Sequence, residues 1–223
     1  WHAQRRGSKT LTASYAGMES SVVVQVSEGA ITDLVLVIDS VDSTGSLQEM
    51  TADDEITIKV KAVDSDGNRW TENVAWTIEH VQFTDQSVLQ EMTYGSTTMF
   101  VPVFASDSFY TLRATYTDAN TTIEVTLNIS VDHGDLISVS LIQPVDLTQN
   151  IDADNSLQFL PQLTDGDGNI IDPSIVSYTL ENTDTGEKTN ITSIIVGNAG
   201  VWEASTVGDW AITAWAISSS GYN

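Results

Sequence analysis

Two short acidic segments are the first residues in this sequence that could do chemistry. Asp64–Asn68 and Asp165–Asn169 share the pattern Asp-x-Asp-Gly-Asn, and closely spaced carboxylates are the ligands that Ca²⁺ prefers. A helix–loop–helix calcium site, however, needs glycine at its sixth position and a bidentate glutamate at its twelfth. Here glycine is fourth, and the twelfth residue is Ala75 or Val176. Glycine beside Asp or Asn supplies the positive φ of a tight hairpin, so we expect turns rather than metal sites.

A second group of carboxylates lies near two short polar segments, Ser27–Gly29 and Asp132–Gly134, or recurs at one position in a repeating pattern. Clustered oxygen atoms favour hard cations, and a calcium ion there would stiffen a joint between domains. A solvated acidic loop explains the same residues and is the interpretation we favour. No other cofactor is expected. The candidate calcium ligands are Asp53, Asp54, Asp132, Asp135, Asp152 and Asp154.

Exposed tryptophans could bind sugars by stacking on their rings. Trp215 is out of phase with Ile212 and Ala214, so we expect its side chain to point outward, and Trp70 lies beside the first acidic turn. Partial cover by an adjacent loop is the alternative, which we favour. Trp70 and Trp215 are therefore the candidate ligand-contact residues.

Three Asn-x-Ser/Thr sequons, at Asn120, Asn128 and Asn190, are candidate N-glycosylation sites. Asn128 lies on the outward phase of a predicted strand, and we expect the other two in loops, so all three should be accessible. Serine and threonine are common in this chain, and chance alone explains most of these sequons.

No arrangement of residues typical of an enzyme is present in the sequence. His2, His80 and His133 are scattered, and the chain lacks a His-Glu-x-x-His pair, a nucleophile elbow, a phosphate-binding loop and a dinucleotide fingerprint. Pairs of carboxylates abound because the chain is acidic, which makes a glycosidase interpretation unspecific. We therefore expect no catalytic residues and no enzyme activity.

Composition narrows the classes of partner. The 223 residues include 8 Lys+Arg and 31 Asp+Glu, giving a formal net charge of −23, which opposes binding to nucleic acid and to anionic membranes. The absence of cysteine excludes disulfides, thiolate metal sites and cysteine nucleophiles. No apolar run is long enough to span a bilayer. Such acidity fits a saline or calcium-bearing exterior, although acidic proteins occur in every compartment.

The chain repeats itself at an interval of about 100 residues. Val74–His80 aligns with Val176–Asn182, and the two acidic turns keep the same offset. A third, partial copy stands at the front, where Leu11-Thr12-Ala13 matches Ile212-Thr213-Ala214. We therefore predict that residues 1–29 are the last strands of a preceding repeat, 30–133 a whole domain, and 134–223 a domain without its last strand.

Within each repeat the apolar residues alternate with polar ones, as in Ile123–Val131 and Ile56–Ala62. Alternation with period two predicts antiparallel strands with one buried and one solvated face. About seven short strands in about 100 residues are typical of an immunoglobulin-like sandwich, with Trp76 and Tyr178 as core aromatics. Pro161 removes a hydrogen-bond donor, so we expect its strand to be an edge strand or to contain a bulge. The predicted fold is all-β, with tandem immunoglobulin-like β-sandwich domains in a rod.

The order of strand, Asp-x-Asp-Gly-Asn turn, Val-x-Trp/Tyr-Thr strand and Gly-x-Trp/Tyr strand resembles the bacterial immunoglobulin-like (Big) repeats. The resemblance covers essentially the whole chain. Such repeats occur in invasin- and intimin-like adhesins and in surface-layer or filament proteins, so the resemblance implies a fold more specifically than a function.

The two ends of the chain bear on assembly. It begins at Trp1 rather than Met, so we expect it to be processed or cut from a longer protein. Residues 134–223 should lack the strand matching Thr122–Val131, whereas Ser21–Val26 supplies such a strand without a sandwich of its own. Either the chain is a window onto a longer array, which we favour, or one subunit donates this strand to the next and builds a filament.

The sequence therefore predicts a non-enzymatic extracellular structural module of a cell-surface adhesin, surface layer or filament. Its expected partners are neighbouring repeats or further copies of itself, and in addition a glycan. The alternative function is a carbohydrate-binding accessory module that uses Trp70, Trp215 or neighbouring loops.

Overall fold

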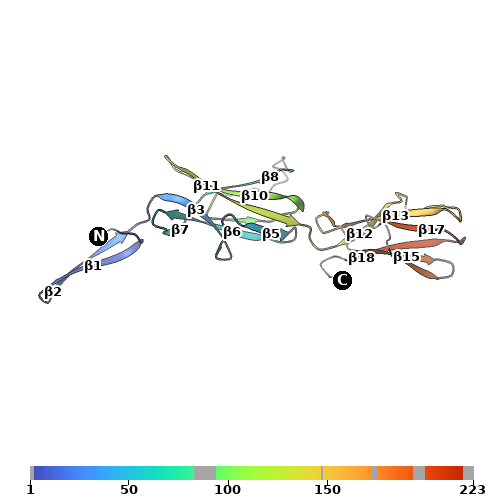
Figure 1. Ribbon diagram of the computed structural model, residues 1–223, viewed down its shortest axis with the longest axis horizontal. Helices are drawn as coiled ribbons and strands as arrows, with labels where there is room; N and C mark the ends of the chain where they lie inside the picture. The colour runs from blue at the N-terminus through green and yellow to red at the C-terminus, as the bar shows by residue number, and fades with distance from the viewer. Residues whose placement is uncertain (1–2, 83–93, 147, 172–174, 193–198, 218–223) are drawn as a thin grey trace. The chain divides into compact units, whose positions relative to one another are not determined.

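A computed structural model describes residues 3–82, 94–146, 148–171, 175–192 and 199–217 of the chain (Figure 1). All regular structure in these residues is β-strand, and they contain no helix that could cross a membrane. Trp1 and His2 lie outside the described residues.

The chain divides into two compact units. Neither unit is continuous in sequence, because each consists of three segments. Unit 1 comprises Trp1–Met50, Asp54–Pro102 and Ser106–Asp132. Unit 2 comprises Thr51–Asp53, Val103–Ala105 and His133–Asn223.

Unit 1 contains one hairpin and two sheets. The hairpin pairs β1 (Gly7–Tyr15) with β2 (Met18–Val26). One sheet, of order β4-β3-β6-β7 with β9 also paired to β6, consists of β3 (Ile31–Ile38), β4 (Val41–Asp42), β6 (Ile56–Asp64), β7 (Arg69–Thr71) and β9 (Thr97–Phe100). The other, of order β5-β11-β10-β8, consists of β5 (Leu47–Thr51), β8 (Ala75–His80), β10 (Ser106–Thr117) and β11 (Thr122–Asp132).

The described residues of unit 2 form two sheets in a related arrangement. One sheet, of order β12-β13-β14 with β17 also paired to β13, consists of β12 (Ser138–Gln143), β13 (Ser156–Thr164), β14 (Ile170–Ile171) and β17 (Gly200–Glu203). The other, of order β16-β15-β18, consists of β15 (Ile175–Asn182), β16 (Lys188–Thr192) and β18 (Trp210–Ile217).

The cores arise from the alternation predicted from the sequence. In β6, Ile58, Val60 and Ala62 are buried, whereas Lys59 between them is exposed, because successive side chains of a strand point to opposite faces. In unit 1, the inner faces of both sheets contribute Leu34, Leu36, Ile58, Val60, Trp76, Ile78, Phe100, Leu112, Leu127 and Ile129. In unit 2, the core cluster consists of Phe159, Leu163, Ile171, Val176 and Tyr178.

The two units place their core aromatics in the same register. Trp76 in β8 pairs with Ala114 in β10, and Tyr178 in β15 pairs with Ala214 in β18. Both aromatic side chains are buried, at 4% and 0% exposure, which confirms their predicted position in the core. In each unit, a small alanine therefore stands opposite the bulky ring.

The strand order is that of an immunoglobulin-like sandwich. One sheet joins β3, β6 and β9, and the facing sheet joins β8, β10 and β11, which are the A-B-E and C-F-G groupings of that fold. The predicted all-β, immunoglobulin-like class is therefore confirmed. The tandem arrangement in a rod and the boundaries 1–29, 30–133 and 134–223 stay predictions.

Pro161 occupies β13, which pairs on both sides and is therefore not an edge strand. Its partner across the sheet is Leu141, and the register shifts between Leu141 and Gln143. The proline thus lies opposite a register shift whose extra residue is in β12. The sequence therefore predicted an irregularity at this strand pair but placed the bulge in the wrong strand.

Gly200 in β17 is a packing constraint in the core of unit 2. A Cβ at this position would lie 2.7 Å from Cε2 of Tyr178 and 3.0 Å from Cδ2 of Phe159. The rings of Phe159 and Tyr178 are themselves in contact, with centroids 5.5 Å apart, so neither can move aside freely.

We expect Gly200→Ala to destabilise the chain by about 1–3 kcal/mol, because an added methyl group overpacks a filled core. Urea unfolding measures the loss. Gly166→Ala is the matched control, since its Cβ would meet only Cγ1 of Ile137 at 3.9 Å. Equal stability of the two variants would contradict the tight packing at Gly200.

Candidate functional site

The first acidic turn is organised around the carboxylate of Asp64, which closes β6. Its Oδ1 accepts hydrogen bonds from the backbone N–H groups of Asp66 at 3.0 Å and Asn68 at 2.9 Å. Its Oδ2 accepts from Nδ2 of Asn68 at 2.9 Å and from the backbone N–H of Gly29 at 3.1 Å. The carboxylate therefore ties the turn to the segment that enters β3.

The second turn reproduces these bonds around Asp165 at the end of β13. Oδ1 of Asp165 accepts from the backbone N–H groups of Asp167 at 3.0 Å and Asn169 at 2.8 Å. Oδ2 accepts from Nδ2 of Asn169 and from the backbone N–H of Gly134, both at 2.8 Å. Two segments about 100 residues apart in sequence thus form one and the same polar constellation.

Both motifs are turns, as the sequence predicts. Gly67 and Gly168 have φ values of +79° and +87°, which glycine adopts without a steric cost. In the turns, the N–H groups of these glycines donate to the carbonyl oxygens of Asp64 and Asp165 at 3.0 and 3.3 Å.

The two central carboxylates are buried, at 4% exposure for Asp64 and 3% for Asp165. The side-chain amide of Asn68, with the backbone N–H groups around it, holds the pKa of Asp64 below its ordinary value. Burial acts to raise the pKa of Asp165, but the bonds from Asn169, Gly134 and Asp167 outweigh it, so this pKa is also lowered. N–H donors stabilise a charged carboxylate where water cannot reach it.

These carboxylates are structural acceptors. The hydrogen bonds described above reach them from N–H groups of the turn or of the adjoining segment. Among the described residues, no three Asp, Glu or His side chains gather closely enough to hold a metal ion together.

The predicted calcium ligands lie on exposed loops and strand ends. Asp53 accepts a hydrogen bond from the backbone N–H of Asp135 at 2.7 Å, and both belong to unit 2. Asp154 has a φ of +77° and its N–H donates to the carbonyl of Ala204. Calcium binding stays a prediction for the whole set, whose exposed members are Asp53, Asp54, Asp132, Asp135, Asp152 and Asp154.

The three sequon asparagines are all exposed. Asn120 lies in the turn between β10 and β11, and Asn128 lies in β11, where its Oδ1 accepts from Thr111 at 3.2 Å. Asn190 lies in strand β16 rather than in the predicted loop, and its Oδ1 accepts from Thr179 of β15 at 3.0 Å. The short polar strand Lys188–Thr192 lacks an apolar alternation that would reveal it in the sequence. Glycosylation stays a prediction.

The predicted tryptophan contacts occupy separate places. Trp215 in β18 is 45% exposed and so points outward as expected. Trp70 in β7 is partly buried, and its indole N–H donates to Glu72 at 3.2 Å. Their role as ligand contacts stays a prediction.

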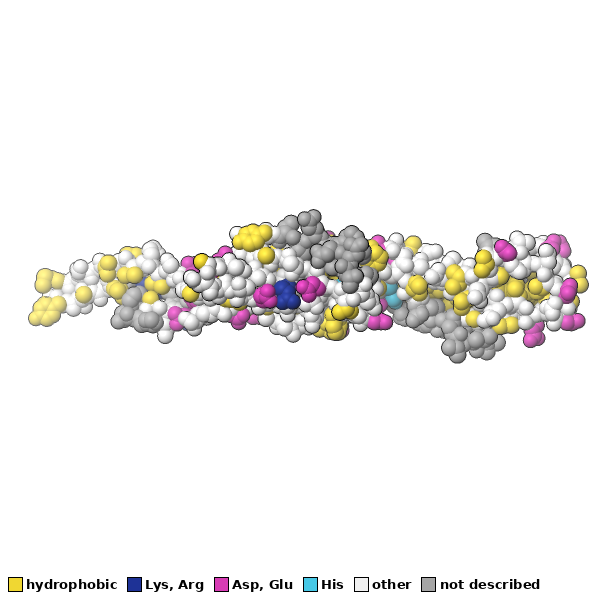
Figure 2. All heavy atoms as spheres, turned by 90° about the horizontal axis from the view of Figure 1, so that it is seen from above, with side chains coloured by type: hydrophobic (Ala, Val, Ile, Leu, Met, Phe, Trp, Pro, Cys, Tyr) yellow, Lys and Arg dark blue, Asp and Glu magenta, His cyan; other side chains and the backbone are white. Residues whose placement is uncertain are grey.

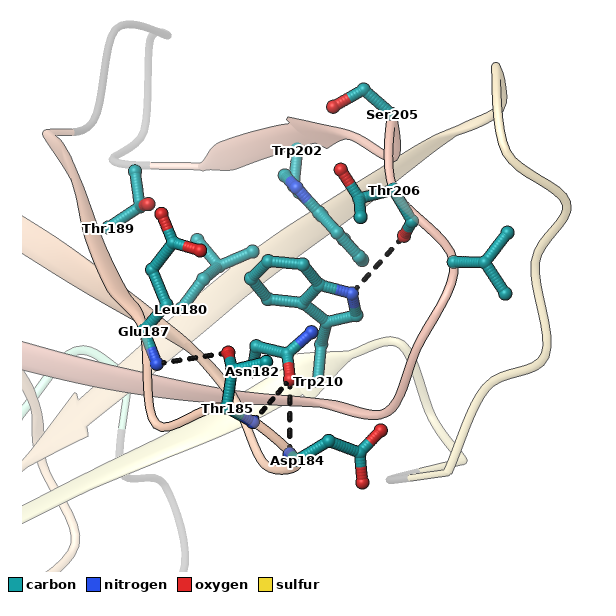
Figure 3. Close-up of a pocket in the computed structure, with 11 residues that line it drawn as sticks. Leu180, Asn182, Asp184, Thr185, Glu187, Thr189, Trp202, Ser205, Thr206 and Trp210 are labelled. Atoms are coloured by element: carbon teal, nitrogen blue, oxygen red, sulfur yellow. Dashed lines mark hydrogen bonds between the residues drawn. The ribbon is translucent and has the colours of Figure 1, made fainter.

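A pocket of about 420 Å³ in unit 2 is lined by two other tryptophans (Figure 3). The rings of Trp202 and Trp210 lie 5.5 Å apart at 53°, and the indole N–H of Trp210 donates to the carbonyl of Thr206 at 3.3 Å. Both rings are half-buried. The remaining lining residues are Leu180, Asn182, Asp184, Thr185, Glu187, Thr189, Ser205, Thr206 and Val207.

Sequence reasoning missed this pocket and the wider role of the acidic turns. The phase of Trp210 along its strand predicts a core position, yet Trp210 is the first residue of β18 and lines the pocket with Trp202 of β17. The available signal for the turns was that Asp and Asn recur in both copies as well as Gly, because a plain hairpin turn depends chiefly on glycine.

The surface of the chain is acidic. Figure 2 shows acidic side chains spread along one face and far fewer basic ones. Several basic side chains are engaged locally: Arg6 pairs with Glu28 at 2.6 Å, and Arg113 pairs with Glu124 at 2.8 Å.

No protein-family model matches the sequence, and no curated protein matches it either. Among solved structures, the FN1–FN3 domains of chicken CNTN1 align over 95% of this chain and 70% of that one, with 9% identity and a TM-score of 0.33. Titin domains A168–A170 align over 97% and 70%, with 13% identity and a TM-score of 0.33.

Domains 4 and 5 of the S-layer protein SbsC align over 84% of this chain and 94% of that one, with 15% identity and a TM-score of 0.29. With TM-scores this low, the fold assignment rests on the sheet order and register of the chain itself. Membership of the Big repeats stays a prediction.

The lowered pKa values predict how stability depends on pH. Because the folded-state pKa values of Asp64 and Asp165 lie below the unfolded value of 3.8, their bonds stabilise the fold fully above that pH. The contribution is lost as pH falls through the folded-state pKa values.

We expect Asp64→Asn/Asp165→Asn to be less stable than the wild type at pH 7, with a difference in urea midpoint that shrinks below about pH 4. The control Asp66→Asn/Asp167→Asn removes the same charge from exposed positions of the same turns. A difference that is the same at pH 3 and pH 7 would contradict the assignment.

Proposed function

We propose that this chain is a non-enzymatic structural module of an extracellular, repeat-built protein, such as a surface adhesin, a surface layer or a filament. One observation carries the proposal: the polar constellation that recurs in both units ties backbone segments together. Asp64 and Asp165 each accept hydrogen bonds from the asparagine side chain of their own turn and from a glycine N–H of the adjoining segment. A repeated bond set of this kind maintains a scaffold and has no group free to act on a substrate.

The hairpin β1–β2 supports assembly with another domain of the same kind. Its strands pair in the register Leu11↔Val22 and Tyr15↔Met18, and cross-strand partners share one face. In β10–β11 the matching pair, Leu112↔Leu127, is fully buried. The hairpin face instead exposes Tyr15 at 82%, Met18 at 69% and Val22 at 56%.

Figure 2 shows apolar side chains over this hairpin. An exposed apolar face of a two-stranded ribbon is suited to contact with a complementary sheet. We propose that the sheet of a second copy covers it. Strand donation from β2 to β18, which pairs with β15 in the described residues, is the specific form of assembly we propose.

The hairpin offers a matched pair of variants. Val22 and Val23 are neighbours in β2 with 56% and 59% exposure, but they lie on opposite faces. If the Leu11–Val22 face mediates assembly, Val22→Asp should weaken self-association by about tenfold or more, because it places a charge in an apolar contact. Sedimentation equilibrium of the full chain over a range of concentrations measures the dissociation constant.

Val23→Asp adds the same charge on the other face and should leave the association unchanged. A wild-type chain that stays monomeric at every concentration, or equal effects of the two variants, would count against assembly through this face.

The pocket favours a second candidate function, that of a carbohydrate-binding accessory module. Trp202 and Trp210 offer ring faces of the kind on which a sugar can stack. Asp184, Glu187 and Thr189 line the same pocket, and carboxylate and hydroxyl oxygens can accept hydrogen bonds from sugar hydroxyl groups. The net charge of −23 favours neutral over anionic sugars.

Under this second function, Trp210→Ala should weaken binding of a neutral oligosaccharide by about tenfold, as measured by titration calorimetry after a glycan array identifies the ligand. Trp215→Ala, outside the pocket lining, should bind normally. If Trp215→Ala alone lost binding, the site would lie on the outer face of β18, and a silent array would remove this candidate.

A further inference from the structure

Each asparagine of the acidic turns reaches beyond its own turn to a distant stretch of backbone. Nδ2 of Asn68 donates to the carbonyl of Gln4 at 3.0 Å, and Oδ1 of Asn68 accepts from the N–H of Arg6 at 3.3 Å. One side-chain amide thus bonds a carbonyl and an N–H two residues apart, as a neighbouring strand would.

The second turn makes the same pair of bonds. Nδ2 of Asn169 donates to the carbonyl of Val103 at 2.9 Å, and Oδ1 of Asn169 accepts from the N–H of Ala105 at 2.9 Å. The segment Val103–Ala105 belongs to unit 2, although the next residue begins β10. In the first copy, the bound segment likewise comes directly before β1.

The buried aspartate explains how the asparagine is held in place. Nδ2 of Asn169 has two hydrogens, and it bonds both Oδ2 of Asp165 and the carbonyl of Val103. The same Oδ2 accepts the N–H of Gly134. One Asp–Asn pair therefore fixes two pieces of chain at once, and the pair Asp64–Asn68 does so with Gly29 and residues 4–6.

The bound segments share no side-chain chemistry. Gln4-Arg5-Arg6 is polar and basic, whereas Val103-Phe104-Ala105 is apolar. The bonds from the asparagines to these segments go to main-chain atoms in both cases. What the turn recognises is therefore backbone.

A hairpin turn requires none of this. Positive φ at Gly67 and Gly168 closes the turns, and an outward, solvated Asn would serve as well. The same four-way arrangement in two copies, with a buried charge at its centre, indicates a binding site for main chain.

We propose that the Asp-x-Asp-Gly-Asn turn is a backbone clasp. Within each unit it holds a distant stretch of main chain that leads directly into a strand, Gln4–Arg6 before β1 and Val103–Ala105 before β10. Asn68 and Asn169 bind the segment, and Asp64 and Asp165 position them. This inference rests on the proposed structural function, in which the clasp fixes the backbone of a scaffold.

The test uses the full chain and ¹⁵N NMR, with Asn169→Ala compared against Asp167→Ala. Asp167 lies in the same turn, its side chain is exposed, and its backbone N–H makes the turn bond in either variant. We expect the amide of Ala105 to exchange with solvent roughly threefold to tenfold faster in Asn169→Ala, the effect of one lost hydrogen bond. Asp167→Ala should leave this amide unchanged.

A second readout separates a clasp from a merely local bond. ¹⁵N relaxation reports the backbone motion of Val103–Ala105 relative to the strands of unit 2, and Asn169→Ala should increase this motion more than Asp167→Ala does. Unchanged amide spectra for Phe159 and Tyr178 verify that unit 2 stays folded, and Asn169→Ser serves if Asn169→Ala does not.

Unaltered exchange at Ala105, or identical relaxation in both variants, would overturn the clasp. Neither result touches self-association through the hairpin, so failure of the clasp and failure of the proposed function are distinguishable.

Discussion

The structure depends on one constraint: each strand must bury alternate side chains against a facing sheet, with no covalent bond to help. The chain has no cysteine, so packing around Trp76 in unit 1 and Tyr178 in unit 2 holds the layers together. The register that sets an alanine opposite each ring follows from this constraint, because a shift by one residue would expose every core side chain. Loops and turns are then fixed by where the strands end.

The acidic turns show how a charged side chain can be buried in this fold. Asp64 and Asp165 lie at the ends of β6 and β13, where the alternation of the strand directs their side chains toward the interior. A buried carboxylate is costly unless N–H groups surround it, and the tight turn supplies two of them from its own backbone. The second carboxylate oxygen also accepts a hydrogen bond from a segment elsewhere in the chain. The local turn therefore makes a tertiary contact.

The sequence predicts the features of the structure that depend on a periodic pattern of residues. Alternation in Ile56–Ala62 identifies a strand, and the copy of Trp76 at Tyr178 identifies a second core. The missing donor of Pro161 signals an irregular pairing, but it does not reveal that the extra residue lies in β12. The partners of Asn68 and Asn169 could not be predicted, because those bonds depend on where loops bring distant backbone and not on local pattern. The pocket at Trp202 and Trp210 could not be predicted for a similar reason, because the alternation along a strand does not reveal where the facing sheet ends.

Recognition of main chain by Asn68 and Asn169 has an evolutionary consequence. A contact that ignores side-chain identity places no demand on the sequence it binds, so segments as different as Gln4–Arg6 and Val103–Ala105 make the same bonds. Mutations that change these side chains can therefore accumulate during evolution while the hydrogen bonds persist.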